Sequence, residues 1–509
     1  MPITVTHAFV SPKTEQTDPT IVGPNEWNAQ HVVTGYVDPP PPVVLPTVPY
    51  LVTSDYNFAE QWFTQPLSAG VQATVTISPV PKGVYGNDAN HYLYISPVSG
   101  QGTGTAEAVL IQGGTANGGG TSGTIIFTPA NNHTGVWRLT SATAGIQETL
   151  RMLPYPGGWA IIPAGGWSIF APITVNTSGI KLQGAGRINT QLNYQLTAGA
   201  CFSIPGSNDQ ITMSDFQLNG SGGSAIGLNL VNQSNFNCQR MAIVGFATGV
   251  SNTGNSNTQM SLFRDMNIMN NSGDAVYIDT TIDGGTWERI VIGGPGNGFH
   301  IRDAVGAHIT HCYTNGCAIG ALIDPVSPRS VGVIQFVDTN FDGFSGTSNM
   351  GIRLSPASGA TINTVIFQGG GAGGFNYGFM MDGAGTIWDI TFRDMLILAN
   401  NVVGGQIGQS TLAKCDNILV KDCYFEANSA GSPGANPGLN IQYATNVQVH
   451  GGVYCAGSYA NGANTQGYGI TVAGATTNVQ IFNLRVNPNV AGSIQQAGTN
   501  TNLVIQNVL

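Results

Sequence analysis

A short pattern recurs from Met213 to Asn507: an apolar residue, a variable residue, and then Asp, Asn, Gly, Arg or His. Examples are Phe263-Arg264-Asp265, Ile309-Thr310-His311 and Val420-Lys421-Asp422. Successive copies lie roughly 22 to 32 residues apart, a spacing typical of stacked repeat units. Units this short cannot bury a core alone, so the pattern predicts a solenoid in which neighbouring units stack.

The repeats contain only short, strand-like segments. One unit is predicted to form three strands, at Gln259–Phe263, Met266–Met269 and Ala275–Asp279. The leucine positions and helical arcs of leucine-rich repeats are absent, so strands stacked unit on unit should be parallel. The sequence therefore predicts an all-β protein whose residues 159–509 form a right-handed parallel β-helix of about a dozen coils. The 70 glycines and the charged content of only 8% agree with a fold that is rich in turns.

Two segments of different composition begin the chain. Residues 1–36 are polar and irregular, with several prolines, and are predicted to be an attachment arm. Residues 37–49 contain the run Asp38-Pro39-Pro40-Pro41-Pro42, which favours extended polyproline II structure and predicts a semi-rigid linker. The arm should therefore be held away from the rest of the chain.

A small β domain is predicted at residues 50–144, where apolar and polar residues alternate between clusters of Gly, Asn and Pro. The predicted strands are Ala73–Ile77, His91–Ile95, Ala106–Ile111, Gly123–Phe127 and Val136–Leu139. They indicate a β-sandwich or barrel that serves as a neck. Residues 145–158 include a helix-like segment, which is predicted to cap the first coil of the solenoid.

Charge and cysteine content restrict the partners. With a formal charge of -10 and no run of Lys or Arg, the chain is not expected to bind nucleic acid. No stretch approaches the roughly eighteen apolar residues of a membrane helix, so membrane insertion is not expected, and the start lacks the pattern of a secretory signal. The seven cysteines include no CxxC pair, so no disulfide framework, metal site or other cofactor is expected. Cys238, Cys312 and Cys423 are predicted to be small buried hydrophobes.

The aligned repeats place many charged residues in one column that is predicted to be structural. This column lies between two strands, where a bend is required, and Asp, Asn, His and Gly tolerate the left-handed backbone best. Arg240 should lie between two Asp residues of neighbouring coils and pair with both. His311 and Asp338 belong to this ladder and are not predicted to be a catalytic pair. The members are Asp215, Arg240, Asp265, Arg289, His311, Asp338, Gly369, Asp394, Asp422, Gly451, Asn483 and Asn507.

A second column, on the strand after the recurring Gly, carries the candidate functional residues. Strand alternation places its polar side chains on one outward face over several coils. A flat face of this kind can hold an elongated glycan through hydrogen bonds to Arg and Asp and stacking on Tyr. The catalytic candidates are Asp279, Asp324 and Asp382, and the glycan-binding candidates are Tyr277, His300, Arg302 and Arg353.

The spacing of the first two candidates suggests a reaction. Asp279 and Asp324 are expected two coils apart, about 9 to 10 Å by the strand spacing, which is near the outer limit for inverting glycoside hydrolysis. Arg302 between them would keep at least one ionised. Two other interpretations stay open from the residues alone: a solvated face of ion pairs, and glycan binding without catalysis.

The opening of the repeats resembles a known family. The runs Trp159–Trp167, Ile173–Val175 and Ile180–Gly186 look like the first coils of pectate-lyase-like β-helix domains, and Met1–Gly35 resembles the amino-terminal segment of bacteriophage tail proteins. Residues 90–111 resemble a domain that precedes such β-helices in phage proteins. The polygalacturonase motifs and the calcium-binding carboxylates of pectate lyases are missing.

The resemblance implies a phage tailspike or tail fibre. Such proteins are usually homotrimers that bind, and often cleave, bacterial surface polysaccharide. The implied partners are therefore two further copies of the chain, phage tail or baseplate proteins at the arm, and a host glycan, and the implied location is the virion tail after assembly in the host cytoplasm. A non-enzymatic virion fibre or decoration protein is the alternative. A secreted bacterial polysaccharide lyase fits less well because no secretory signal is evident.

Overall fold

The structure is a computed structural model. It describes residues 3–5, 31–33, 50–51, 61–88, 90–154, 156–206, 208–254, 261–280, 284–344, 349–409, 414–456, 465–486 and 488–509. The chain divides into two units, residues 1–47 and 48–509. In the first, β1 (Ile3–Val5) pairs antiparallel with β2 (His31–Val33). The rest of the predicted arm and the polyproline linker lie outside the described residues.

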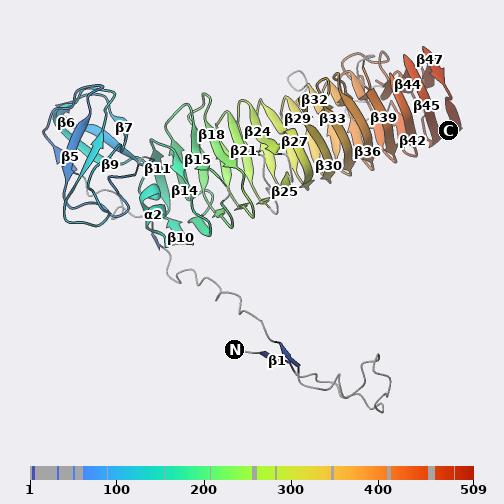
Figure 1. The fold of residues 1–509 in the computed structure, drawn as a ribbon. Coiled ribbons are helices and arrows are strands. Elements are labelled where there is room, and N and C mark those ends of the chain that lie inside the picture. Colours follow the sequence, from blue (N-terminus) through green and yellow to red (C-terminus); the bar gives the residue numbers. More distant parts are fainter. Residues whose placement is uncertain are drawn as a thin grey trace, which may run out of the picture. The chain divides into compact units, whose positions relative to one another are not determined.

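The second unit begins with small antiparallel sheets (Figure 1). One sheet has the order β4-β9-β6-β7, and a second pairs β5 with β8. All five predicted strands form, because their alternate apolar residues, such as Val75, Leu93 and Trp137, are buried in one core. The bounds are β4 Gln61–Phe63, β5 Ala73–Ile77, β6 Tyr92–Thr103, β7 Glu107–Leu110, β8 Gly123–Phe127 and β9 Thr134–Ser141.

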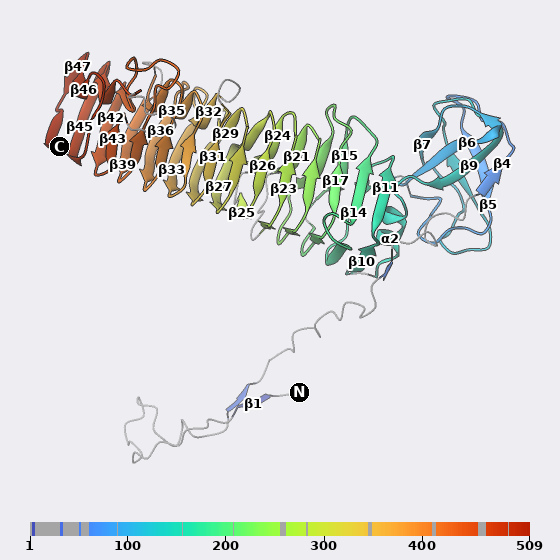
Figure 2. The ribbon, with the colours of Figure 1, turned by 180° about the vertical axis from the view of Figure 1, so that it is seen from behind.

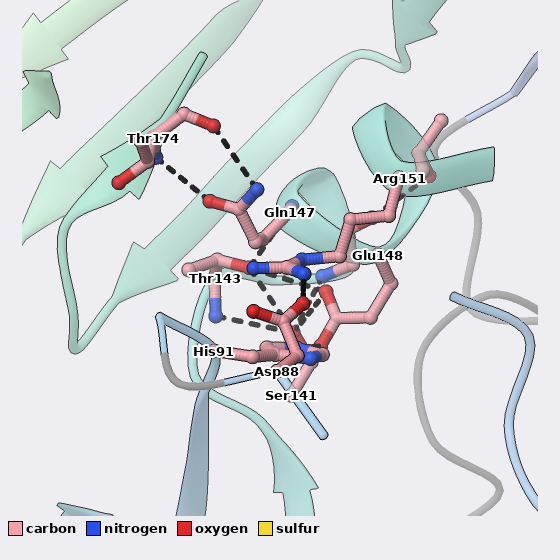
Figure 3. Close-up of polar contacts among 10 residues, drawn as sticks. Asp88, His91, Ser141, Thr143, Gln147, Glu148, Arg151 and Thr174 are labelled. Carbon is pink, nitrogen blue, oxygen red and sulfur yellow. Dashed lines mark hydrogen bonds and ion pairs between the residues drawn. The ribbon is translucent and has the colours of Figure 1, made fainter. Parts of the chain in front are cut away.

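Helix α2 (Ile146–Met152) joins these sheets to the solenoid, where the sequence predicts a cap. Gln147 acts as a substitute strand partner: its Oε1 accepts from the backbone N–H of Thr174 at 2.7 Å, and its Nε2 donates to the carbonyl of Thr174 at 3.0 Å (Figure 3). Thr174 belongs to β12 (Ile173–Thr174) at the start of the solenoid. The helix therefore satisfies backbone groups at the solenoid's open end.

The other side of α2 contacts the small β domain through buried polar groups. The Glu148 carboxylate lies 3.0 Å from His91 Nε2 and accepts from Ser141 Oγ at 2.9 Å and Thr143 Oγ1 at 3.2 Å (Figure 3). His91 and Glu148 are both fully buried. Because buried polar groups are costly to leave unpaired, this cluster fixes the helix against the small β domain.

From β10 onward the chain winds through a parallel β-solenoid, in which three ladders of strands run through successive coils (Figures 1 and 2). Ladder 1 also receives β3 (Tyr50–Leu51), which pairs parallel with β10. Its strands are β10 Gly158–Ile162, β13 Ile180–Gly184, β16 Thr212–Ser214, β19 Asn237–Gln239, β22 Leu262–Arg264, β25 Gly285–Glu288, the end of β27 (Asn297–Thr310), β30 Ser330–Val337, β33 Thr361–Gln368, β36 Thr386–Arg393, β39 Lys414–Lys421, β42 Ala444–His450, β45 Ala475–Leu484, β47 Thr499–Thr501 and β48 Val504–Val508.

Ladder 2 is a separate sheet of twelve strands, which confirms the predicted dozen or so coils. Its strands are short because each occupies only the stretch after a bend. They are β11 Gly165–Ile169, β14 Thr190–Tyr194, β17 Gln217–Asn219, β20 Ala242–Val244, β23 Asn267–Met269, β26 Val291–Gly293, β28 Tyr313–Asn315, β31 Asn340–Asp342, β34 Gly371–Gly373, β37 Leu396–Leu398, β40 Tyr424–Glu426 and β43 Val453–Cys455.

Ladder 3 carries the predicted functional face. Besides β12 and the start of β27, its strands are β15 Ala200–Ile204, β18 Ile226–Val231, β21 Thr248–Gly254, β24 Asp274–Thr280, β29 Ile319–Ile323, β32 Met350–Leu354, β35 Tyr377–Met381, β38 Val403–Ile407, β41 Leu439–Gln442, β44 Tyr468–Ala473 and β46 Gly492–Gln496. The all-β parallel solenoid is confirmed; its right-handed sense stays a prediction.

The interior of the solenoid is a continuous apolar core. Aromatic rings at the same register position stack between coils: Phe336 on Phe367 at 4.8 Å and Phe367 on Phe392 at 5.1 Å, with nearly parallel planes. The seven cysteines form no disulfide, and all except Cys455 are buried. Burial raises the pKa of the Cys312 thiol to about 12, so this cysteine is an unreactive core residue, as predicted.

The bend between ladders 1 and 2 confirms the structural column. Every predicted member has a positive φ, from +48° at Asp338 to +67° at Gly369 and Gly451. One detail of the prediction is wrong. Arg240 forms a bidentate pair with Asp215 at 2.6 and 2.8 Å, but Asp265 is instead bound by Arg289. Each Arg of the ladder therefore pairs with the ladder Asp of the preceding coil, and Arg289 also pairs with its neighbour Glu288.

Candidate functional site

The predicted site residues lie on or directly after five strands of ladder 3, and these strands do not form one uniform polar face. Polar groups gather on β24, β27 and the segment after β29, where they form a group that we call the acidic cluster. On β29 and β35, Leu322 and Met380 take the outward register positions but are buried. The acidic cluster consists of Asp274, Tyr277, Asp279, His300, Asp303, Asp324 and Arg329.

His300 lies at the centre of this cluster. Its Nδ1 is 2.9 Å from Asp274 Oδ2, and its Nε2 is 2.7 Å from Asp324 Oδ1. Burial alone would lower the pKa of His300, but the hydrogen bonds to the two carboxylates outweigh this and raise it to about 9. The imidazole is therefore cationic at neutral pH, with both nitrogens donating, and it cannot act as a general base there.

Asp279 and Asp303 lie side by side on neighbouring coils. The register between β24 and β27 shifts after Ile278, so Asp279 pairs with Asp303 and not with Arg302. Arg329 contacts both: its Nη1 pairs with Asp279, and its Nε is 3.8 Å from Asp303 Oδ2. The expected arrangement, with Arg302 between two aspartates, is wrong because this β-bulge changes which residue occupies the outward position.

The two carboxylates have different surroundings. The Asp303 side chain is 8% exposed and that of Asp279 is 17% exposed. Burial raises the pKa of Asp303 to about 6. Asp279 accepts a hydrogen bond from the Tyr277 hydroxyl at 3.0 Å. A pair of acids in unlike environments is the arrangement that supplies a proton donor and an ionised partner near neutral pH.

The other predicted residues lie apart from this pair. Asp382 forms a bidentate ion pair with Arg353 at 2.7 and 3.1 Å, and it is 8% exposed. Asp324 Oδ1 is already hydrogen-bonded to His300 Nε2. The Nε of Arg302 is buried and has no hydrogen-bond partner among the described residues. The structure therefore brings Tyr277, Asp279, His300 and Asp324 together, and it leaves Asp382 and Arg353 as a separate pair.

Three members of the cluster were not predicted from the sequence. Asp303 follows Arg302 and falls on the inward side in a regular strand, so only the bulge brings it beside Asp279. Asp274 starts β24 and precedes Tyr277 and Asp279, the outward residues that were predicted on this strand. Arg329 comes from the turn before β30, which lies outside the repeat pattern. A charged residue at an inward strand position, such as Asp303, is the one signal that could have indicated an irregularity.

Two kinds of feature are lacking among the described parts of the chain. No group of three or more His, Cys, Asp or Glu side chains there could hold a metal ion. No helix in the described ranges is long and apolar enough to cross a membrane.

Comparison with known proteins gives distant structural likenesses only. No protein-family model matches the sequence, and no curated protein matches it. Tailspike protein 3 of bacteriophage CBA120 is similar in structure, at 9% identity and a TM-score of 0.45, with 67% of this chain and 56% of that chain covered. The A-module of mannuronan C-5 epimerase AlgE4 from Azotobacter vinelandii has 14% identity and a TM-score of 0.36, with 69% and 89% covered.

A third likeness is to the catalytic unit of the GH87 alpha-1,3-glucanase from Streptomyces thermodiastaticus. It has 12% identity and a TM-score of 0.31, with 87% of this chain and 88% of that chain covered. With TM-scores below 0.5, these likenesses carry no argument about substrate or mechanism. The solenoid itself is consistent with a tailspike-like parallel β-helix.

Proposed function

We propose that the chain is a bacteriophage tailspike whose solenoid binds a bacterial surface polysaccharide and hydrolyses it at the acidic cluster. The observation that carries the catalytic part is the pairing of Asp303, which has a pKa raised to about 6 by burial, with Asp279 on the next coil. Perturbed acids at a partly exposed surface are typical of functional sites. The resemblance of Met1–Gly35 and Trp159–Gly186 to phage tail and β-helix segments supports the tailspike assignment.

In the proposed reaction, Asp303 donates its proton to the glycosidic oxygen while the bond from that oxygen to the anomeric carbon breaks. Neighbouring parallel strands lie about 4.8 Å apart, which is close to the roughly 5 Å carboxyl separation of retaining glycosidases. Asp279 is therefore the nucleophile that bonds to the anomeric carbon. Ionised Asp303 then takes a proton from water, whose oxygen displaces Asp279 and restores both groups.

Neighbouring residues position these two acids. Arg329 and the Tyr277 hydroxyl orient the Asp279 carboxylate. Protonated His300 fixes Asp274 and Asp324 on the same face, where their free oxygen lone pairs accept hydrogen bonds from sugar hydroxyls. Arg302 lies on the same strand as His300, and we include it among the residues that contact the glycan. The glycan-binding roles predicted for Tyr277, His300 and Arg302 are part of this proposal.

The place in the virion is also part of the proposal. Residues 1–36 dock to the phage tail or baseplate, and three copies of the chain assemble after synthesis in the host cytoplasm. Residues 37–49 serve as the spacer that lets the shaft extend toward the host glycan. Immunogold labelling of purified virions with an antibody against the solenoid tests this location, and labelling absent from the tail would contradict it.

The catalytic assignment is tested by release of reducing ends from host polysaccharide. Asp303→Asn and Asp279→Asn should each lower the rate by at least about 100-fold, and Asp338→Asn in the turn ladder should leave it unchanged. Asp324→Asn and Asp382→Asn separate this assignment from the one based on sequence. If either of these abolishes hydrolysis while Asp303→Asn does not, the Asp279–Asp303 pair is not the catalytic pair.

A non-enzymatic fibre is the second candidate function. It is favoured by the ion pairs already present on this face, because Asp274, Asp324 and Asp382 each have a cationic partner. In that case the face would bind glycan without cleaving it. A spot of purified protein on a host lawn would leave no halo, and reducing ends would not increase with the native chain.

A further inference from the structure

A hollow of about 360 Å³ lies on ladder 2, a different sheet from the acidic cluster. It crosses four successive coils, from β28 through β31 and β34 to β37. Its lining includes Tyr313, Asn340, Asp342, Gly373, Leu396 and Leu398. Nothing in the proposed reaction uses these residues.

The hollow exists because one coil lacks side chains on its outer face. Gly371 and Gly373 of β34 are in register with Asn340 and Asp342 on one side and with Leu396 and Leu398 on the other. The flanking coils are therefore separated by about two strand spacings, close to 10 Å. A Cβ on Gly371 would lie 2.6 Å from the Leu396 carbonyl oxygen, and one on Gly373 would lie 2.9 Å from that of Leu398. A side chain at either position would clash with the backbone of β37, so glycine is required at the bottom of the hollow.

The two walls differ in chemistry. On one wall the Tyr313 hydroxyl donates to Asp342 Oδ2 at 2.8 Å, which fixes the aromatic ring and the carboxylate together. The other wall is apolar, and Leu396 is 46% exposed there. A concave site with apolar lining and a few oriented polar groups is typical of a ligand pocket.

The charge of ladder 2 selects the type of ligand. Asp342 and Glu426 are the charged residues in its twelve strands, which contain no Lys or Arg. An anionic sugar would meet these carboxylates without a Lys or Arg in the same strands to compensate. A neutral sugar offers apolar C–H faces to Leu396 and Leu398 and hydroxyl donors to Asp342. The complementary ligand is therefore an uncharged glycan segment.

We propose that this hollow is a second glycan site, which binds a neutral stretch of oligosaccharide apart from the cleavage site on ladder 3. This inference rests on the proposed function, because it assumes that the shaft meets a polysaccharide. Two sites on one rigid solenoid would raise the overall affinity for a long chain through effective concentration, without any added contact at the acidic cluster.

The test uses an array of short neutral oligosaccharides of hexoses and N-acetylhexosamines, probed with the full chain carrying Asp303→Asn to prevent cleavage. Leu398→Arg, which fills the hollow, and Tyr313→Ala, which removes a wall, should each weaken binding by about tenfold or more. Asn267→Ala, an outward residue of the same ladder away from the hollow, should leave binding unchanged.

Unchanged binding in both hollow variants would overturn the proposal. It would also be overturned if Leu398→Arg changed the oligomeric mass in solution, because the hollow would then be an interface between copies of the chain. Hydrolysis is measured separately for Leu398→Arg with Asp303 intact. Retained hydrolysis with lost array binding supports the second site, whereas hydrolysis that survives Asp303→Asn contradicts only the proposed catalytic pair.

Discussion

Asp279 and Asp303 occupy the same register position on neighbouring coils and share the guanidinium group of Arg329. Regular strand alternation would place Arg302 there, and a β-bulge replaces it with an acid. The bulge also brings Asp303 from the inward side to a position that is still largely buried, which raises its pKa to about 6. A local irregularity thus turns an ion-pair face into a pair of acids with unlike surroundings.

Arg329 should be required for the arrangement of this acid pair. Arg329→Gln removes the cation that contacts both carboxylates, so the repulsion between them is no longer offset and their arrangement should be disturbed. We expect the rate of reducing-end release at neutral pH to fall by about tenfold or more. Arg289→Gln, in the turn ladder, is the matched control, and an equal loss in both variants would mean that only stability had changed.

His300 should make the stability of the solenoid depend on pH. Its pKa is about 9 in the folded chain, against 6.5 for an ordinary histidine. Because the folded pKa is raised, the stabilisation is complete below pH 6.5 and is lost as the pH rises through about 9. The shift bounds the loss at roughly 3 kcal/mol. Urea unfolding midpoints of His300→Gln should lack this decline, and parallel pH curves for variant and native chain would refute the pairing.

Glu148 should be essential to the junction between α2 and the small β domain. Glu148→Ala leaves His91, Ser141 and Thr143 buried without their shared acceptor. We expect a destabilisation on the order of 3 kcal/mol, with faster hydrogen exchange in β6 and β9 than in the solenoid. Glu148→Gln, which keeps one acceptor oxygen, should destabilise the protein less than Glu148→Ala does. Equal exchange rates for all three chains would contradict the role of this cluster.

The turn ladder should depend on backbone conformation and not on charge. Asp394 is exposed and has a φ of +56°. Asp394→Gly should be nearly neutral, whereas Asp394→Val should cost about 1 to 2 kcal/mol because a β-branched residue resists the left-handed region. Chemical unfolding of the two variants measures the difference. A destabilisation by Gly as large as that by Val would show that the carboxylate itself is needed.

The solenoid and its ladder were predictable because they repeat. A single residue such as Asp338 is ambiguous, but the same residue types at the same point of many units identify a left-handed bend. The acid pair was not predictable for the opposite reason. Asp303 depends on one bulge in one coil, and Arg329 comes from a turn outside the repeat. Long-range pairing of this kind leaves no periodic signal.

The dependence of the hydrolysis rate on pH tests the central claim most directly. If Asp303 is the proton donor, kcat/KM for host polysaccharide should fall as the pH rises through about 6, because the acid loses its proton there. Asp303→Asn should reduce the rate by at least about 100-fold and remove this limb of the profile. A native-like rate in Asp303→Asn, or a limb that survives the substitution, would contradict the proposed role of Asp303.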